Sequence, residues 1–227
     1  GALDALLAAA DRDEAARKDA VSVLALDPDH VGAHVNLGAL MRRRGDLAGA
    51  TASLSRAVVL DPKNAAAHVN LAGVFVSQGA MARAVVEYEA ALATSPSLVE
   101  ALTELAWTRA TSPSASIRNP AAAVGYAERA AARTSRSDAR ALDALAAAYA
   151  AGGRYRDAVT TLDEALALIP AGAADADESR RLLEERRALY RSRRAFVDPM
   201  PPLMPKRSRK IDALAPWARI SGTHHSL

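Results

Sequence analysis

The sequence predicts an all-α fold, an α-solenoid of stacked helix-turn-helix hairpins. Three observations support this prediction. Alanine, the residue with the highest intrinsic helix propensity, accounts for 56 of the 227 residues. Only 4% of the residues are aromatic, which disfavours the pleated faces of a β-sandwich or a barrel. One segment pattern recurs every 34 residues and ends at Pro28, Pro62 and Pro96, a period typical of stacked helical repeats.

Composition also excludes several classes of function. The absence of cysteine removes disulfides, zinc ribbons, iron–sulfur sites and thiol nucleophiles. No apolar run approaches the roughly 18 to 20 residues of a membrane span, and no secretory leader pattern is present. Phosphate loops and nucleophile motifs are also missing, so we expect no enzyme activity, no cofactor and no metal. His34 and His68 take the same place in successive repeats without a third ligand, and we interpret them as helix contacts.

The repeat has a clear physical logic. Small residues recur where helix backbones must approach closely, and large apolar residues fill the remaining space. One set of equivalent apolar–small pairs consists of Leu37-Gly38, Leu71-Ala72, Leu105-Ala106 and Leu145-Ala146. Gly45, Gly79 and Gly153 mark turns that need a left-handed backbone. The pattern resembles the tetratricopeptide repeat family, whose 34-residue units each contain two helices; Arg109 departs from it, at a position that is large in the other repeats.

This resemblance implies that the solenoid winds into a right-handed superhelix, and it divides the chain into successive segments. They are a truncated leading unit at 1–30, repeats at 31–64, 65–98, 99–137 and 138–172, a capping helix at 173–196 and a basic, proline-rich tail at 197–227. The leading unit lacks its opening residues, which indicates a fragment. Its first helix is expected to carry Leu3 and Leu7, and its second helix Ala16, Ala20 and Val23.

The later segments depart from the regular repeat. In the third repeat an inserted loop at 111–120, rich in polar residues and with two prolines, displaces the second helix by five residues. Arginine and glutamate back the apolar stripe of the capping helix, as the end of a solenoid requires. That stripe consists of Leu182, Leu183, Leu189 and Tyr190.

The resemblance implies a groove, lined by the first helix of each repeat, that takes an extended peptide or a partner helix. The candidate groove residues are Asn36, Arg43, Asn70, Glu100, Glu104, Trp107 and Arg140. Asn36 and Asn70 share one slot, and an asparagine amide both donates and accepts, so it can pair with any peptide backbone. The arrangement is similar to the asparagine ladder of O-linked N-acetylglucosamine transferase. The alternative is that these amides bond to a neighbouring helix or to water.

Trp107 also has two interpretations. It could anchor a partner, since tryptophan often dominates binding energy, or it could pack under the loop at 111–120. The carboxylate clamp that binds chaperone tails in some relatives is disfavoured, because this chain lacks the clamp's side chains at four positions. These positions are Val35, Ala39, Glu100 and Glu104.

The tail is expected to be extended and mostly disordered, with a short segment around Trp217 that could dock. Its basic run contains Lys206, Arg207, Arg209 and Lys210. Such a run could bind nucleic acid, anionic lipid or an acidic protein, or it could simply keep the chain soluble. Without interleaved aromatic residues we do not expect a nucleic-acid partner.

We therefore predict a scaffold or assembly subunit that binds a protein or peptide partner in its groove, as part of a larger complex. The stretch at 105–113 resembles end modules of bacterial tetratricopeptide repeat proteins. This likeness supports an alternative prediction, a soluble accessory module of a larger, membrane-bound glycosyltransferase-like protein whose catalytic part is absent here. The compartment and the partner stay open at this point.

Overall fold

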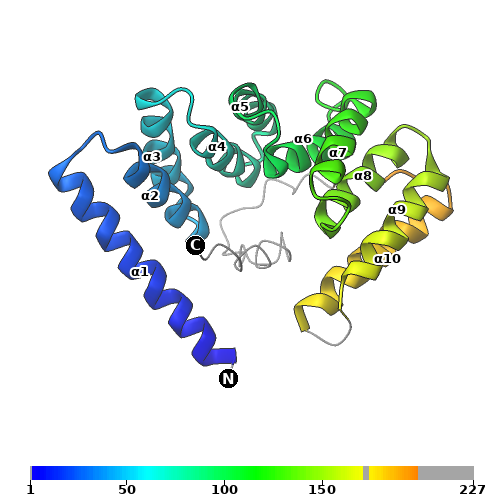
Figure 1. Ribbon diagram of the computed structural model, residues 1–227, viewed down its shortest axis with the longest axis horizontal. Coiled ribbons are helices and arrows are strands. Elements are labelled where there is room, and N and C mark those ends of the chain that lie inside the picture. The colour runs from blue at the N-terminus through cyan, green and yellow to red at the C-terminus, as the bar shows by residue number, and fades with distance from the viewer. Residues whose placement is uncertain (1, 171–173, 199–227) are drawn as a thin grey trace. The chain divides into compact units, whose positions relative to one another are not determined.

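The computed structural model describes residues 2–170 and 174–198, in which ten α-helices and no strand occur. The helices are α1 (Ala2–Leu26), α2 (Val31–Arg43), α3 (Leu47–Leu60), α4 (Ala65–Ser77), α5 (Met81–Thr94), α6 (Val99–Thr111), α7 (Pro120–Arg133), α8 (Ala139–Ala151), α9 (Tyr155–Leu168) and α10 (Ala174–Arg191) (Figure 1). From α2 to α9 they form four hairpins, each with a first helix of 13 residues and a second of 14. The predicted all-α solenoid of helix-turn-helix repeats is confirmed.

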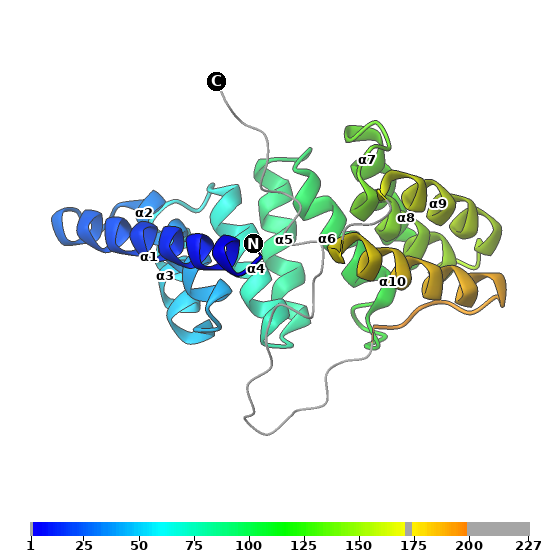
Figure 2. The same ribbon diagram turned by 90° about the horizontal axis from the view of Figure 1, so that it is seen from below.

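The chain divides into two compact units, one up to Pro96 and the other from Ser97. In the first unit, α1 packs on α2, and α3 packs on α4 (Figure 1). In the second unit, α6 lies beside α7 and α8, while α9 lies between α8 and α10 (Figure 1, Figure 2). Each unit has its own apolar core. The largest fully buried side chains are Leu54, Val74 and Phe75 in the first unit, and Leu102, Leu105, Leu142, Leu145, Leu162 and Tyr190 in the second.

The turns between paired helices use the predicted glycines. Gly45, Gly79 and Gly153 have φ of 81°, 74° and 79°, in the left-handed region that side chains disfavour. Each turn is a Schellman motif, in which the residue after the glycine donates its N–H to a carbonyl five residues earlier. At Gly79, for example, the Ala80 N–H donates to the Phe75 carbonyl over 2.8 Å. This bond satisfies a carbonyl at the end of the helix.

The small residues hold the helices close together, as the repeat pattern predicts. A Cβ on Gly38 would lie 2.4 Å from Cγ of Leu54, so α2 and α3 approach too closely there for any larger residue. The equivalent residues Ala72, Ala106 and Ala146 are completely buried. At Gly38 the buried Leu54 side chain fills the space that a Cβ would need, so a small residue is required at this position.

The leading segment differs from the prediction. α1 is one continuous helix of 25 residues, whereas the repeat pattern suggested two helices in residues 2–26. The physical reason is the sequence between the two expected helices. Residues 8–15 contain neither glycine nor proline and consist largely of alanine and charged residues, so nothing interrupts the helix.

The third hairpin contains the predicted loop. α6 ends at Thr111, and α7 begins at Pro120, whose missing N–H suits the first turn of a helix. The Asn119 side chain caps α7 by accepting from the Ala122 N–H over 3.1 Å. The loop is also tied to α6, because the Asn119 N–H donates to the Arg109 carbonyl over 2.7 Å.

The final helix ends earlier than predicted. α10 stops at Arg191, although the apolar stripe suggested a helix up to residue 196. Arg193 adopts a left-handed φ of 56° and completes a Schellman motif, in which the Arg194 N–H donates to the Leu189 carbonyl over 3.0 Å. Residues 195–198 then continue without regular structure. Most of the predicted basic tail, including Lys206, Arg207, Arg209, Lys210 and Trp217, lies outside the described residues.

Candidate functional site

The predicted contact residues lie on two separate faces, one in each unit. The first-unit face belongs to α2 and α4 and consists of Val35, Asn36, Ala39, Arg42, Asn70 and Gly73. The second-unit face belongs to α6 and α8 and consists of Thr103, Glu104, Trp107, Arg140 and Asp143. The two faces differ in what covers them, and this difference decides which of them is open to a partner.

The first-unit face presents its two asparagines to solvent. Asn36 and Asn70 are both partly exposed, at equivalent places on α2 and α4. The Asn70 amide nitrogen donates to the Ala66 carbonyl of its own helix over 2.9 Å. This bond orients the side chain and uses one of its two N–H groups, while the carbonyl oxygen can still accept.

Arg42 adds a positive charge to the same face. Its guanidinium carbon lies 3.4 Å from the place that a Cβ on residue 73 would take, so Gly73 leaves room for this side chain. The Arg42 Nε is buried and has no hydrogen-bond partner within the described part of the chain. A carboxylate on a partner would match the charge of this guanidinium.

Arg43, a predicted groove residue, is engaged by α1. Its guanidinium donates to both carboxylate oxygens of Asp13, over 3.2 and 2.7 Å. The next residue, Arg44, pairs with Glu14 over 2.8 Å, and Glu14 also accepts from Arg17. These hydrogen bonds, first from Arg17 and then from Arg44, lower the pKa of Glu14 to about 2. Arg43 therefore helps to join α1 to α2.

The second-unit face contains a buried ion pair. Arg186 of α10 donates to both carboxylate oxygens of Asp143 on α8, over 2.9 and 2.6 Å. Asp143 is 2% exposed and Arg186 is 5% exposed. Burial raises the pKa of Asp143, while the charge and hydrogen bonds of Arg186 oppose that shift.

Residues that follow α10 pack on Trp107. The ring centroids of Trp107 and Phe196 are 5.7 Å apart, and the Arg186 guanidinium lies 5.3 Å from the indole centroid. The indole N–H donates to a carboxylate oxygen of Asp198 over 3.4 Å. Trp107 is therefore half-buried, whereas the family pattern suggested a solvent-facing position. It packs against Phe196.

The remaining predicted residues of this face are also placed. Glu100 is exposed, and Arg140 pairs with Glu104 over 2.5 Å. These last two side chains help to line a cavity of about 10 Å³, which is close to the volume needed for one water molecule. The Thr103 hydroxyl is buried beside it without a hydrogen-bond partner in the described residues.

Sequence reasoning missed Arg186, Phe196 and Asp198 as members of this face. Two signals were available. Asp143 is an acidic residue inside an otherwise alanine-rich helix, which requires a partner when it is buried. Phe196 is one of only two phenylalanines in the chain.

The two histidines have structural roles. The Nε2–H groups of His34 and His68 donate to the carbonyls of Pro28 and Pro62, over 2.9 and 3.0 Å. Each bond therefore joins the first helix of a repeat to the proline that closes the preceding one. In the described residues no three His, Asp or Glu side chains are placed to hold a metal, and none of the helices there is long and apolar enough to cross a membrane.

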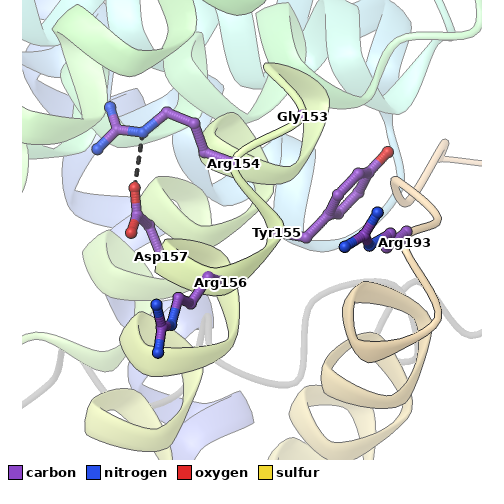
Figure 3. A pocket seen from close by; sticks show the side chains of 6 residues that line it. All are labelled: Gly153, Arg154, Tyr155, Arg156, Asp157 and Arg193. Atoms are coloured by element: carbon purple, nitrogen blue, oxygen red, sulfur yellow. Dashed lines mark hydrogen bonds and ion pairs between the residues drawn. The ribbon is translucent and has the colours of Figure 1, made fainter.

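A larger pocket of about 410 Å³ lies at the turn between α8 and α9. Figure 3 shows Tyr155 beside Arg193, and Arg156 pointing away from them. Arg154 donates to Asp157 over 2.7 Å (Figure 3). None of the predicted contact residues lines this pocket.

Comparison with known families agrees with the hairpin geometry. Two models described as tetratricopeptide repeat match the chain, one at residues 1–65 and 42–99 and the other at residues 141–174. Together they cover more than half of the sequence. The chain belongs to the tetratricopeptide repeat family. No curated protein sequence matches this tetratricopeptide repeat protein.

Solved structures share its fold at low sequence identity. The MamA protein is 22% identical and has a TM-score of 0.58, with 70% of this chain and 84% of MamA covered. The protein TTC0263 of Thermus thermophilus is 18% identical, with a TM-score of 0.61 over 81% of this chain and 96% of that one. YrrB is 19% identical, with a TM-score of 0.57 over 77% and 84%. These likenesses concern the tetratricopeptide fold alone.

Proposed function

We propose that this tetratricopeptide repeat protein is a non-catalytic scaffold whose first-unit face binds an extended peptide or a helix of a protein partner. One observation carries the proposal. Asn36 and Asn70 take equivalent places in successive repeats and lie on a face that includes Arg42. Repeat proteins bind partners over such surfaces, because successive units present the same side chain at a regular spacing.

The chemistry of the face describes the partner. The Asn70 carbonyl oxygen can accept from a backbone N–H, and the amide of Asn36 can both donate and accept. Arg42 favours a carboxylate nearby, so we expect an acidic residue in the bound segment. The description of YrrB as a protein with an unusual peptide-binding site supports peptide binding by this fold.

The experiment compares three forms of the full chain as bait in extracts of the native host. Asn36→Ala with Asn70→Ala should lower recovery of the partner at least tenfold, with helicity and melting temperature unchanged. A matched control replaces two exposed polar residues outside α2 and α4, Lys63→Ala with Thr94→Ala, and should recover as much partner as the wild type. Equal recovery of the partner by all three forms would show that the two asparagines do not contribute to binding. The alternative, an accessory module of a larger catalytic protein, stays a prediction that the full reading frame would test.

A further inference from the structure

Residues 195–198, which we call the return segment, lie against Trp107 of the second-unit face. After α10 the left-handed turn at Arg193 reverses the chain, and the return segment then runs to the end of α6. There the Asp198 N–H donates to the Thr111 carbonyl over 2.9 Å. Thr111 is the last residue of α6, so its carbonyl has no partner inside the helix.

The contacts of the return segment are those of a bound peptide. The ring centroids of Phe196 and Trp107 are 5.7 Å apart, within the distance range of favourable aromatic pairs. Arg186 lies 5.7 Å from the centre of the Phe196 ring. Asp198 meets both the indole N–H of Trp107 and the end of α6. Val197, between these two residues, is 44% exposed.

This alternation defines a recognition pattern. Phe196 and Asp198 contact the protein, while Val197 between them is exposed. The segment thus presents an aromatic side chain and a carboxylate to the face, separated by one exposed residue. Main-chain bonding to the Thr111 carbonyl adds affinity that does not depend on sequence.

The return segment is also lightly held. Its described contacts are one backbone hydrogen bond, one long indole hydrogen bond, one aromatic pair, the approach of the Arg186 guanidinium to Phe196 and partial packing of Phe196 on the apolar core. The preceding residues 192–194 are exposed. Segments with few buried contacts open locally at low free-energy cost while the rest of the unit stays folded.

We propose that the second-unit face is a binding site for an extended peptide with an aromatic–any–acidic pattern, and that the return segment occupies it as an internal ligand. A partner peptide gains access by displacing Phe196 and Asp198. This inference deepens the proposed protein-binding function, but it concerns a different face. The variants at Asn36 and Asn70 leave this face untouched, so either proposal can fail alone.

The test uses the full chain and a fluorescein-labelled, end-blocked peptide with the sequence of residues 192–198. The open variant carries Phe196→Ala and Asp198→Ala, and the matched control carries Val197→Ala in the same segment. A tethered ligand competes at an effective concentration of order millimolar, so we expect the open variant to bind the peptide about tenfold more tightly than wild type or control. A peptide with alanine in place of its phenylalanine should not bind.

A second readout places the peptide on this face. With Trp217→Phe in every form, Trp107 is the remaining tryptophan of the chain. Its emission should shift to longer wavelength in the open variant and return when the peptide binds, while circular dichroism stays constant. Absence of saturable binding to the open variant, or equal affinity for all forms, would overturn the proposal. A wild-type dimer that Phe196→Ala dissociates would also overturn it, because the segment would then be exchanged between two copies.

Discussion

Arg186 on α10 and Asp143 on α8 form a two-pronged ion pair that is almost completely removed from solvent. The pair joins the capping helix to the first helix of the last repeat, across 43 residues of sequence. Burying two charges is expensive, and their attraction offsets this cost only when both remain in place. Loss of either residue should therefore destabilise the packing of α10 on α8.

We expect Arg186→Met to lower the free energy of unfolding by about 3 to 5 kcal/mol, because Asp143 is then left buried without a counter-charge. Methionine keeps much of the side-chain volume, so the loss reports mainly the charge. The double variant Asp143→Leu with Arg186→Met should recover to within about 1 kcal/mol of the wild type, because no buried charge remains. Urea denaturation followed by circular dichroism measures both. A double variant as unstable as the single one would contradict this account.

The same variant should respond to pH in a defined direction. Burial already raises the pKa of Asp143, and removing the guanidinium that opposes this shift raises it further. A carboxyl group with a higher pKa in the folded than in the unfolded state takes up a proton on folding, so acid favours the folded form. The deficit of Arg186→Met should therefore shrink as the pH falls from 7 towards the unfolded value of about 4. An equal loss of unfolding free energy at pH 7 and pH 5 would contradict this explanation.

The hairpins could be predicted from sequence because their determinants are local. Turn glycines and small residues recur at fixed spacing, and the structure shows what they provide: a left-handed backbone at Gly79 and close packing at Gly38. The end of α10 gives no such local signal. Its left-handed residue is Arg193, and an arginine gives no sign of that conformation in the sequence.

The covering of the second-unit face could not be predicted in this way. Trp107 and Phe196 are 89 positions apart, and no periodic pattern connects them. The family pattern places Trp107 at an open slot, and only the path of the chain after Arg193 shows that the slot is filled. The asparagines of the first-unit face could be predicted from the sequence, because Asn36 and Asn70 are separated by the 34-residue period itself.

The turn glycines provide a matched pair of substitutions. Gly79 has φ of 74° and no atom within 4 Å of a Cβ, so Gly79→Ala introduces conformational strain without a clash. It should lower stability by about 1 kcal/mol. Gly125 is a helical residue of α7 with equal space around it, and Gly125→Ala should instead raise stability by about 0.5 to 1 kcal/mol. Denaturation midpoints that move in the same direction for both would contradict this explanation.

Gly38 tests close packing instead of backbone conformation. A Cβ there would overlap Cγ of Leu54, which is fully buried, so Gly38→Ala should cost about 1 to 3 kcal/mol. Leu54→Val removes part of the obstructing side chain at a cost of its own. If the overlap is the cause, the double variant loses less than the sum of the two single losses. Additive losses in this double-mutant cycle would show that Gly38 acts in another way.

Glu14 reports the junction between α1 and α2. Because Arg17 and Arg44 lower its pKa to about 2, the group holds its charge in the folded chain at a pH where the unfolded chain is protonated. The contribution of Glu14 to stability is fully present above its pKa in the unfolded chain, and it is lost as the pH falls towards its pKa in the folded chain. We expect Arg44→Ala to raise the pKa of Glu14 measured by NMR titration of its carboxyl carbon. The shift should be smaller than that caused by Arg17→Ala, since the Arg17 hydrogen bonds have the larger effect. The pair is exposed, so the melting temperature should change little at pH 7. A titration of Glu14 that is the same in Arg44→Ala and in the wild type would show that Glu14 of α1 does not hold this contact with Arg44 in solution.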